Sequence, residues 1–200
     1  MRSDIQVFPT TTLGNNTYLL AVGRDAALVD PQWDAWRFLA AAESQGLTIR
    51  YVLETHVHND HVSGALEVRA ATGAEVVAPA RGAYRFPHRG MAEGDKIDLG
   101  GVVLQAMETP GHTPEHLAYL LSEAGRPVAV FTGGSLLLGS AGRTDLFGKH
   151  PRRPVHPGRS GRRGDPRPAP VPVCAAGAGQ RRPRRAHPGQ RPGPRPGAGR

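Results

Sequence analysis

The sequence has 200 residues and a net charge of +8, which is enough chain for one domain with a buried core. The charge is uneven: residues 1–148 carry 11 Lys and Arg against 16 Asp and Glu, whereas residues 149–200 carry 13 Arg and one Lys against one acid, so the first part offers no basic surface for nucleic acid. No apolar run of about 18 residues and no apolar N-terminal segment is present, and the single cysteine, Cys174, excludes an internal disulfide, so we expect a cytoplasmic protein without a membrane partner.

Residues 5–148 alternate short β-type runs with helical segments, separated by Gly, Pro, Asn and Asp at turn positions. Strands are expected at 5–8, 18–22, 26–30, 51–54, 75–78, 102–108, 117–121 and 128–131. One helix is expected to be capped by Asp34 and stopped by Gly46, and a second to be capped by Ser63 and to run to Gly73. Hairpins mixed with helices between strands predict a layered α/β domain, not a helical bundle or an all-β sandwich.

Residues 149–200 differ in kind, because Arg, Pro, Gly and Ala account for 40 of these 52 residues. Such a segment cannot bury enough surface to offset the entropy of ordering its backbone. We therefore expect a domain of residues 1–148 followed by a disordered tail. The tail is either a basic segment that contacts a polyanion or, as we prefer, the product of a frameshift near residue 148 in a GC-rich gene, in which case it has no evolved role.

The strongest functional signal is Thr-His-Val-His-Asn-Asp-His at residues 55–61, directly after an expected strand. On a strand, His56 and His58 would project to the same face, and a tight turn could bring in Asp60 and His61 from the other side. Imidazole and carboxylate groups suit zinc or iron, and three nitrogen ligands leave an open position for water or substrate. We interpret this segment as a metal site, because an ordinary polar loop rarely holds so many metal-binding side chains.

A second segment, Thr-Pro-Gly-His-Thr-Pro-Glu-His at residues 109–116, also follows an expected strand. Its Pro and Gly residues favour a rigid turn that can hold His112 at the strand end as a third imidazole ligand. His116 begins the next strand, and we expect it to pack or to form a hydrogen bond near the site. Asn15 and Asn16, after Gly14, are expected to form a turn that could border the site.

With these residues the sequence resembles the metallo-β-lactamase superfamily over roughly residues 5–148. The family signature T-H-x-H-x-D-H is matched in full by residues 55–61, and His112 matches the downstream histidine. Residues 110–116 and the Gly-Arg-Thr-Asp segment at 142–145 look most like the glyoxalase II and persulfide dioxygenase branch, some members of which carry a rhodanese domain. The resemblance implies an αββα sandwich with the metal at one edge of the two sheets, here with an incomplete second half.

Two departures from the family pattern affect the expected metal centre. Where the family has Thr-Gly-Asp, with a carboxylate that reaches the metal, this chain has Thr-Gly-Gly, ending at Gly134. The region of the last family histidine is taken by the Arg/Pro/Gly/Ala segment. The resemblance then implies one divalent ion, Fe or Zn, on His56, His58 and His112, whereas Asp60 and His61 alone are too few for a second tightly bound ion.

The resemblance implies an enzyme whose first interpretation is a sulfur dioxygenase that acts on a glutathione-type persulfide. Thioester hydrolysis of the glyoxalase II type is the alternative, with Asp60 as the catalytic residue that holds or deprotonates water. In the dioxygenase, Asp60 would act only indirectly, and the carboxylate missing at Gly134 would be an iron ligand. A third alternative is an inactive remnant that keeps the metal motif. The expected partner is a small thiol, persulfide or thioester, and a homo-oligomer is left open.

Overall fold

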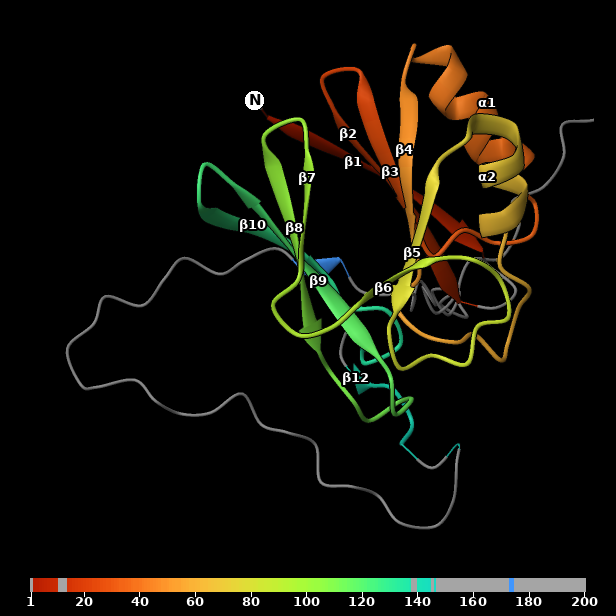
Figure 1. Cartoon of the computed structure of the whole chain (residues 1–200), viewed down its shortest axis with the longest axis vertical. Coiled ribbons are helices and arrows are strands. Elements are labelled where there is room, and N and C mark those ends of the chain that lie inside the picture. The colour runs from red at the N-terminus through yellow and green to blue at the C-terminus, as the bar shows by residue number, and fades with distance from the viewer. Residues whose placement is uncertain (1, 11–13, 138–139, 145, 147–172, 175–200) are drawn as a thin grey trace, which may run out of the picture.

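The computed structural model describes residues 2–10, 14–137, 140–144, 146 and 173–174. These residues form two β-sheets that pack against each other, with two helices on the outer face of the first sheet (Figure 1). This arrangement confirms the expected layered α/β fold. The expected boundary at residue 148 and the expected disorder of residues 149–200 lie outside the described residues, apart from Val173–Cys174.

The first sheet has six strands in the order β1-β2-β3-β4-β5-β6. They are β1 (Ser3–Thr10), β2 (Asn15–Val22), β3 (Asp25–Val29), β4 (Thr48–Leu53), β5 (Glu75–Pro79) and β6 (Arg89–Met91). Strands β1, β2 and β3 form antiparallel hairpins, whereas β3, β4, β5 and β6 pair in parallel. Helix α1 (Trp36–Ser44) connects β3 to β4, and α2 (Ala65–Thr72) connects β4 to β5. Because these strands run parallel, their carboxyl ends meet at one edge of the sheet.

Both helices bury an apolar face against the first sheet. Phe38 of α1 is completely buried, and its ring packs edge-on against Phe8 of β1 with 5.2 Å between ring centroids. Val68 of α2 is also completely buried, in the same apolar cluster. The helices therefore close the outer face of this sheet and fix where the loops between strand and helix emerge.

The helix ends differ in part from the expectation. Asp34 does not cap α1, which has no side-chain cap, because the carboxylate is drawn into an ion pair with Arg37 at 2.9 Å. The Ser63 hydroxyl accepts a hydrogen bond from the Ala65 amide at the start of α2, at 3.0 Å. Helix α2 ends at Gly73, whose φ of 75° is left-handed, as the glycine signal predicts.

The second sheet has the strand order β13-β10-β9-β8-β7. Its strands are β7 (Lys96–Leu99), β8 (Val102–Glu108), β9 (Leu117–Glu123), β10 (Arg126–Phe131) and β13 (Val173–Cys174), and a separate short hairpin joins β11 (Leu136–Leu137) to β12 (Ser140–Ala141). Aromatic and aliphatic side chains fill the space between the sheets, as where Tyr18 and Phe131 meet with ring centroids 5.3 Å apart. Within the described ranges, both helices lie on the first sheet and none covers the outer face of the second.

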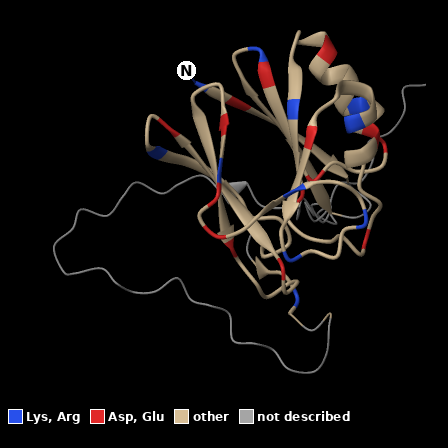
Figure 2. Ribbon diagram, viewed as in Figure 1, with Lys and Arg blue, Asp and Glu red and all other residues tan. Residues whose placement is uncertain are grey.

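Charged residues are distributed over both sheets and the helices. Figure 2 shows Lys and Arg positions interspersed with Asp and Glu positions on most of the described elements. Neither described helix has the length and the apolar run that a membrane crossing requires.

Candidate metal centre

The candidate site lies at the edge of the sandwich where β3, β4, β8 and β10 end. A cavity of about 280 Å³ opens there, and every predicted ligand residue lines it. Its lining consists of Asn15, Asn16, Asp30, His56, His58, Asp60, His61, His112, Gly133, Gly134, Leu137, Gly142 and Arg143. Residues from distant parts of the sequence thus meet at one place, as is usual for sites at the carboxyl ends of parallel strands.

Asp30, directly after β3, anchors the loop that carries the first histidines. Its φ of 48° is left-handed, which is uncommon for a residue with a side chain. One carboxylate oxygen accepts the Thr55 backbone amide and the other accepts the Thr55 hydroxyl, both at 2.8 Å. Burial raises the pKa of the Asp30 carboxyl, but the neighbouring imidazole of His58 and these hydrogen bonds outweigh burial and hold that pKa below its ordinary value.

His58 is held by two buried carboxylates. Its Nε2 lies 3.2 Å from Asp30 Oδ1 and 3.2 Å from Glu54 Oε2, and Ser63 donates to the other Glu54 oxygen at 2.5 Å. Burial lowers the pKa of His58, but the two carboxylates together raise it to about 10. Because Nε2 donates to the carboxylates, Nδ1 is the nitrogen left for an ion, which would displace a proton on binding.

His56 is prepared by a hydrogen-bond chain that starts at Asp30. The Thr55 hydroxyl gives its proton to Asp30, so it accepts from His56 Nδ1, 2.8 Å away. This fixes the tautomer and leaves Nε2 of His56 bare. Burial, followed by the charge on His58, lowers the pKa of His56 to about 2. A neutral imidazole with a bare nitrogen is the form that binds a metal ion.

His112 comes from the loop between β8 and β9. Its Nδ1 lies 3.1 Å from the Arg143 carbonyl oxygen, to which it donates, so Nε2 again remains bare. Its ring centroid lies 5.0 Å from that of His56. The Arg143 carbonyl belongs to the Gly-Arg-Thr-Asp segment singled out in the sequence, of which Asp145 lies outside the described residues.

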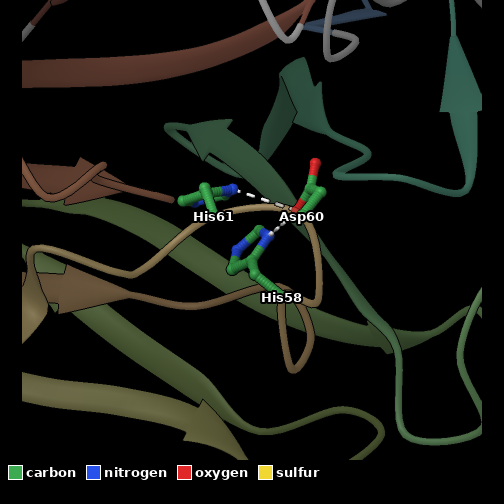
Figure 3. A group of neighbouring side chains, drawn as sticks. All are labelled: His58, Asp60 and His61. Carbon is green, nitrogen blue, oxygen red and sulfur yellow. Dashed lines mark hydrogen bonds and ion pairs between the residues drawn. The ribbon is translucent and has the colours of Figure 1, made fainter.

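Asp60 and His61 lie beside His58 (Figure 3), with the His58 and His61 ring centroids 4.2 Å apart. Asp60 Oδ1 accepts from His61 Nδ1 at 3.1 Å, and Asp60 Oδ2 accepts from the Asn15 amide at 2.6 Å. The hydrogen bond from His61 holds the pKa of the Asp60 carboxyl below its ordinary value; burial opposes this shift and the bond from Asn15 adds to it. His61 Nε2 is buried and has no hydrogen-bond partner, so it is able to bind a ligand.

The chemistry of these donors fits a divalent metal ion. Among the described residues, His58, Asp60 and His61 form one group whose ligand atoms all lie within 4.8 Å of one another (Figure 3). Imidazole nitrogen and carboxylate oxygen together suit zinc or iron. A buried imidazole nitrogen without a partner is costly unless a ligand takes it up, so His61 Nε2 is a candidate donor for a cation.

Two other groups of side chains lie beside the same cavity. Asp30, Glu54 and His58 also gather within 4.8 Å, but their atoms are already taken by the hydrogen bonds described above. The expected trio is more open, with His56 4.1 Å from His58 and 5.0 Å from His112 between ring centroids.

Gly134 stands where the family pattern has a carboxylate. A side chain added at this position would overlap the His112 imidazole, and the Gly134 amide donates to His116 Nε2 at 3.1 Å. The space for a carboxylate is therefore occupied by a ring that is itself held in place. This leaves the histidines as the principal donors.

His116 is completely buried and structural. Its Nδ1 lies 2.8 Å from the Thr109 hydroxyl, its Nε2 accepts the Gly134 amide, and its ring stacks on His56 with centroids 4.9 Å apart. Burial lowers the pKa of His116 to about 3. With both nitrogens engaged it cannot be a ligand, which agrees with the packing and hydrogen-bonding role expected from the sequence.

Sequence reasoning placed Asp30 and Glu54 as the last residues of two strands and missed their part in the site. The available signal was a carboxylate directly after each of two buried aliphatic runs. The parallel pairing of Val29 with Leu53 brings the two carboxylates together. Polar residues at the carboxyl ends of buried parallel strands are the positions at which such folds place their sites.

Comparison with known proteins matches this chain to one family and to several named enzymes. The sequence pattern described as "Metallo-beta-lactamase superfamily" matches residues 10–173. A hydroxyacylglutathione hydrolase from Rhodospirillum rubrum is 43% identical over 119 residues, which are 58% of this chain and 45% of that protein. A second one, from Methylobacillus flagellatus, is 40% identical over 107 residues, 52% of this chain and 42% of that protein. The chain thus spans about half the length of the curated relatives it matches.

Solved structures share the fold. ETHE1 from Myxococcus xanthus is 34% identical with a TM-score of 0.66, covering 72% of this chain and 62% of that one. A metallo-beta-lactamase from Staphylococcus aureus is 29% identical with a TM-score of 0.69, covering 74% of this chain and 46% of that one.

Proposed function

The chain belongs to the metallo-β-lactamase superfamily, and from this premise we propose that it is a metal-dependent hydrolase of glutathione-type thioesters. His56, His58 and His112 would hold one divalent ion, zinc or iron, and Asp60 would be the catalytic base. The observation that carries the proposal is that each histidine has one ring nitrogen tied to a protein acceptor. The other nitrogen of each is then left for an ion at the same cavity.

The substrate class is supported by the relatives. Those matched by sequence are named hydroxyacylglutathione hydrolases. The sequence pattern alone placed persulfide oxidation first, and these relatives reverse that order. The activity is a proposal for this chain, which spans about half of their length.

Thioester hydrolysis at this cavity would use the metal ion and Asp60. The ion, when bound, supplies Lewis-acid polarisation of the thioester carbonyl. Asp60, ionised because His61 and Asn15 donate to it, accepts a proton from a water molecule as that water attacks the carbonyl carbon. The carbon–sulfur bond then breaks, the acyl group leaves as a carboxylic acid, and the proton passes to the thiolate.

Persulfide oxidation is the second candidate, favoured by the sequence pattern at residues 110–116. The carboxylate missing at Gly134 counts against persulfide oxidation, because it would be an iron ligand in a dioxygenase. Any side chain added at residue 134 would overlap the His112 ring, so a carboxylate has no space there. A hydrolase with three imidazole donors does not need this ligand.

The two candidates are separated by assaying one zinc-loaded and one iron-loaded preparation of the full chain. Thioester hydrolysis is followed by thiol release from S-lactoylglutathione, and persulfide oxidation by O2 uptake with glutathione persulfide. We expect thiol release and no O2 uptake. O2 uptake by the iron form without thiol release would establish the dioxygenase, and retained metal with neither activity would establish the inactive remnant.

A further inference from the structure

The β1–β2 hairpin contributes a residue that contacts the catalytic loop. Gly14, with a left-handed φ of 73°, ends the turn, and Asn15 begins β2 opposite Thr10. From there the Asn15 side-chain amide donates to Asp60 Oδ2 at 2.6 Å. The contact joins segments that are 45 residues apart in the sequence.

We propose that Asn15 is a positioning residue that holds Asp60 for catalysis, an inference that rests on the hydrolase function proposed above. By donating to Oδ2, Asn15 leaves Oδ1 to accept the proton of His61 Nδ1. His61 then keeps its bare Nε2 toward the cavity. Asn15 thus sets the orientation of the base and, through the base, the tautomer of His61.

Asp60 needs such an anchor because its side chain is 44% exposed. A carboxylate with that much access to water has several rotamers of similar energy, and each places the oxygens differently. A second donor from a separate strand selects one of them. His61, by contrast, has a side chain only 3% exposed and is confined by packing.

The direction of the hydrogen bond between His61 and its neighbours follows from their chemistry. Asn15 Nδ2 also lies 3.1 Å from His61 Nδ1, so this nitrogen could accept from Asn15 or donate to Asp60. Donation to an ionised carboxylate is the stronger bond. The opposite arrangement would place a proton on His61 Nε2, which is buried without any acceptor.

The test uses zinc-loaded full-length protein and the variants Asn15→Ala, Asn15→Asp and Asp60→Asn, with Asn15→Ala also made in the Asp60→Asn background. We expect Asn15→Ala to lower kcat about 10- to 100-fold at unchanged zinc content. Asn15→Asp, although isosteric, should be at least as damaging because it replaces a donor with a second carboxylate. In the Asp60→Asn background Asn15→Ala should cost nothing further, because Asn15 acts through Asp60.

A second measurement needs no turnover: the ring-nitrogen NMR shifts of His61. Wild type should show the Nδ1–H tautomer, and Asn15→Ala should show a mixture of both tautomers. The matched control is Gln45→Ala, because that side-chain amide donates to Gln6 Oε1 at 3.0 Å outside the cavity, and it should leave the His61 shifts unchanged.

The outcomes separate this inference from the proposed function. If wild type hydrolyses no thioester but the His61 shifts depend on Asn15, the positioning role stands and the hydrolase proposal fails. If thioesters are hydrolysed but Asn15→Asp behaves as wild type, or the effects of Asn15→Ala and Asp60→Asn simply multiply, Asn15 is not a positioning residue. A His61 that carries its proton on Nε2 in the wild type also overturns the inference.

Discussion

Replacing Asp30 with Asn is expected to weaken zinc binding about 10- to 100-fold while the fold is kept. Asn tolerates a left-handed φ such as the 48° seen here, and its Oδ1 can still accept the Thr55 amide at 2.8 Å. What disappears is the acceptor for the Thr55 hydroxyl proton. The Thr55 hydroxyl would then donate to His56 Nδ1 instead of accepting from it. The His56 ring would carry its proton on Nε2, the nitrogen that has to bind the ion.

The expected loss of affinity corresponds to about 1.4 to 2.8 kcal/mol of binding free energy. The free energy of unfolding should fall by about 1 to 3 kcal/mol, because the charge-assisted hydrogen bonds from Thr55 and His58 lose a buried carboxylate. Zinc affinity is measured by competition with a chromophoric chelator, and stability by urea denaturation of the metal-free proteins.

The matched control is Asp25→Asn, which removes a surface carboxylate bonded to Arg50 at 2.7 Å. It should leave zinc affinity unchanged and alter stability by less than about 1 kcal/mol. An Asp30→Asn variant that binds zinc as tightly as wild type would refute the idea that Asp30 sets the His56 tautomer.

Three further outcomes are expected. His56→Ala and His112→Ala should each abolish zinc retention through dialysis, since two imidazoles do not hold the ion. The control is His88→Ala, which should retain zinc, because the His88 ring bonds the Phe86 carbonyl outside the cavity. If His56→Ala or His112→Ala kept its zinc, the replaced histidine would not be a metal ligand. Asp60→Asn should retain zinc but hydrolyse thioesters about two to four orders of magnitude more slowly, whereas an equal rate would show that Asp60 is not the base. Gly73→Ala should lower the free energy of unfolding by about 1 to 2 kcal/mol, because the left-handed φ of 75° is unfavourable for a residue with a side chain. An added Cβ meets no atom within 4 Å, so no steric clash adds to this cost. Urea denaturation should show a smaller loss for Gly73→Asn.

Most strands could be predicted because they bury continuous or alternating aliphatic runs, as β3 and β8 do. Strands β6 (Arg89–Met91) and β7 (Lys96–Leu99) were not predicted, since both are short and begin with a charged residue. They exist because a neighbour offers a free edge: Arg89 pairs with Val77 of β5, and Lys96 pairs with Gln105 of β8. Such pairing depends on tertiary structure and leaves little trace in the local sequence.

The candidate site likewise has residues that could be predicted from the local sequence and one that could not. His56, His58, Asp60 and His61 lie within one short segment, so their residue types and spacing were enough to suggest a shared site. Asp30 could not be added by spacing, because only the parallel register of β3 and β4 brings it to the loop.

The cap expected from Asp34 failed for a similar reason. Asp is a common helix cap, but the local pattern does not show which partner competes for its carboxylate. In the structure that partner is Arg37, one helical turn further on. The sequence alone therefore predicted which side chains line the cavity better than it predicted the hydrogen bonds that orient them.

The most direct test of the central claim is a titration of metal-free full-length protein with zinc, in which S-lactoylglutathione hydrolysis is recorded against equivalents of zinc per chain. If His56, His58 and His112 hold a single ion, the rate should rise linearly and level off at one equivalent. Zinc that binds without producing hydrolysis would contradict the proposed enzyme, and a rate that levels off only at two equivalents would contradict the single metal centre.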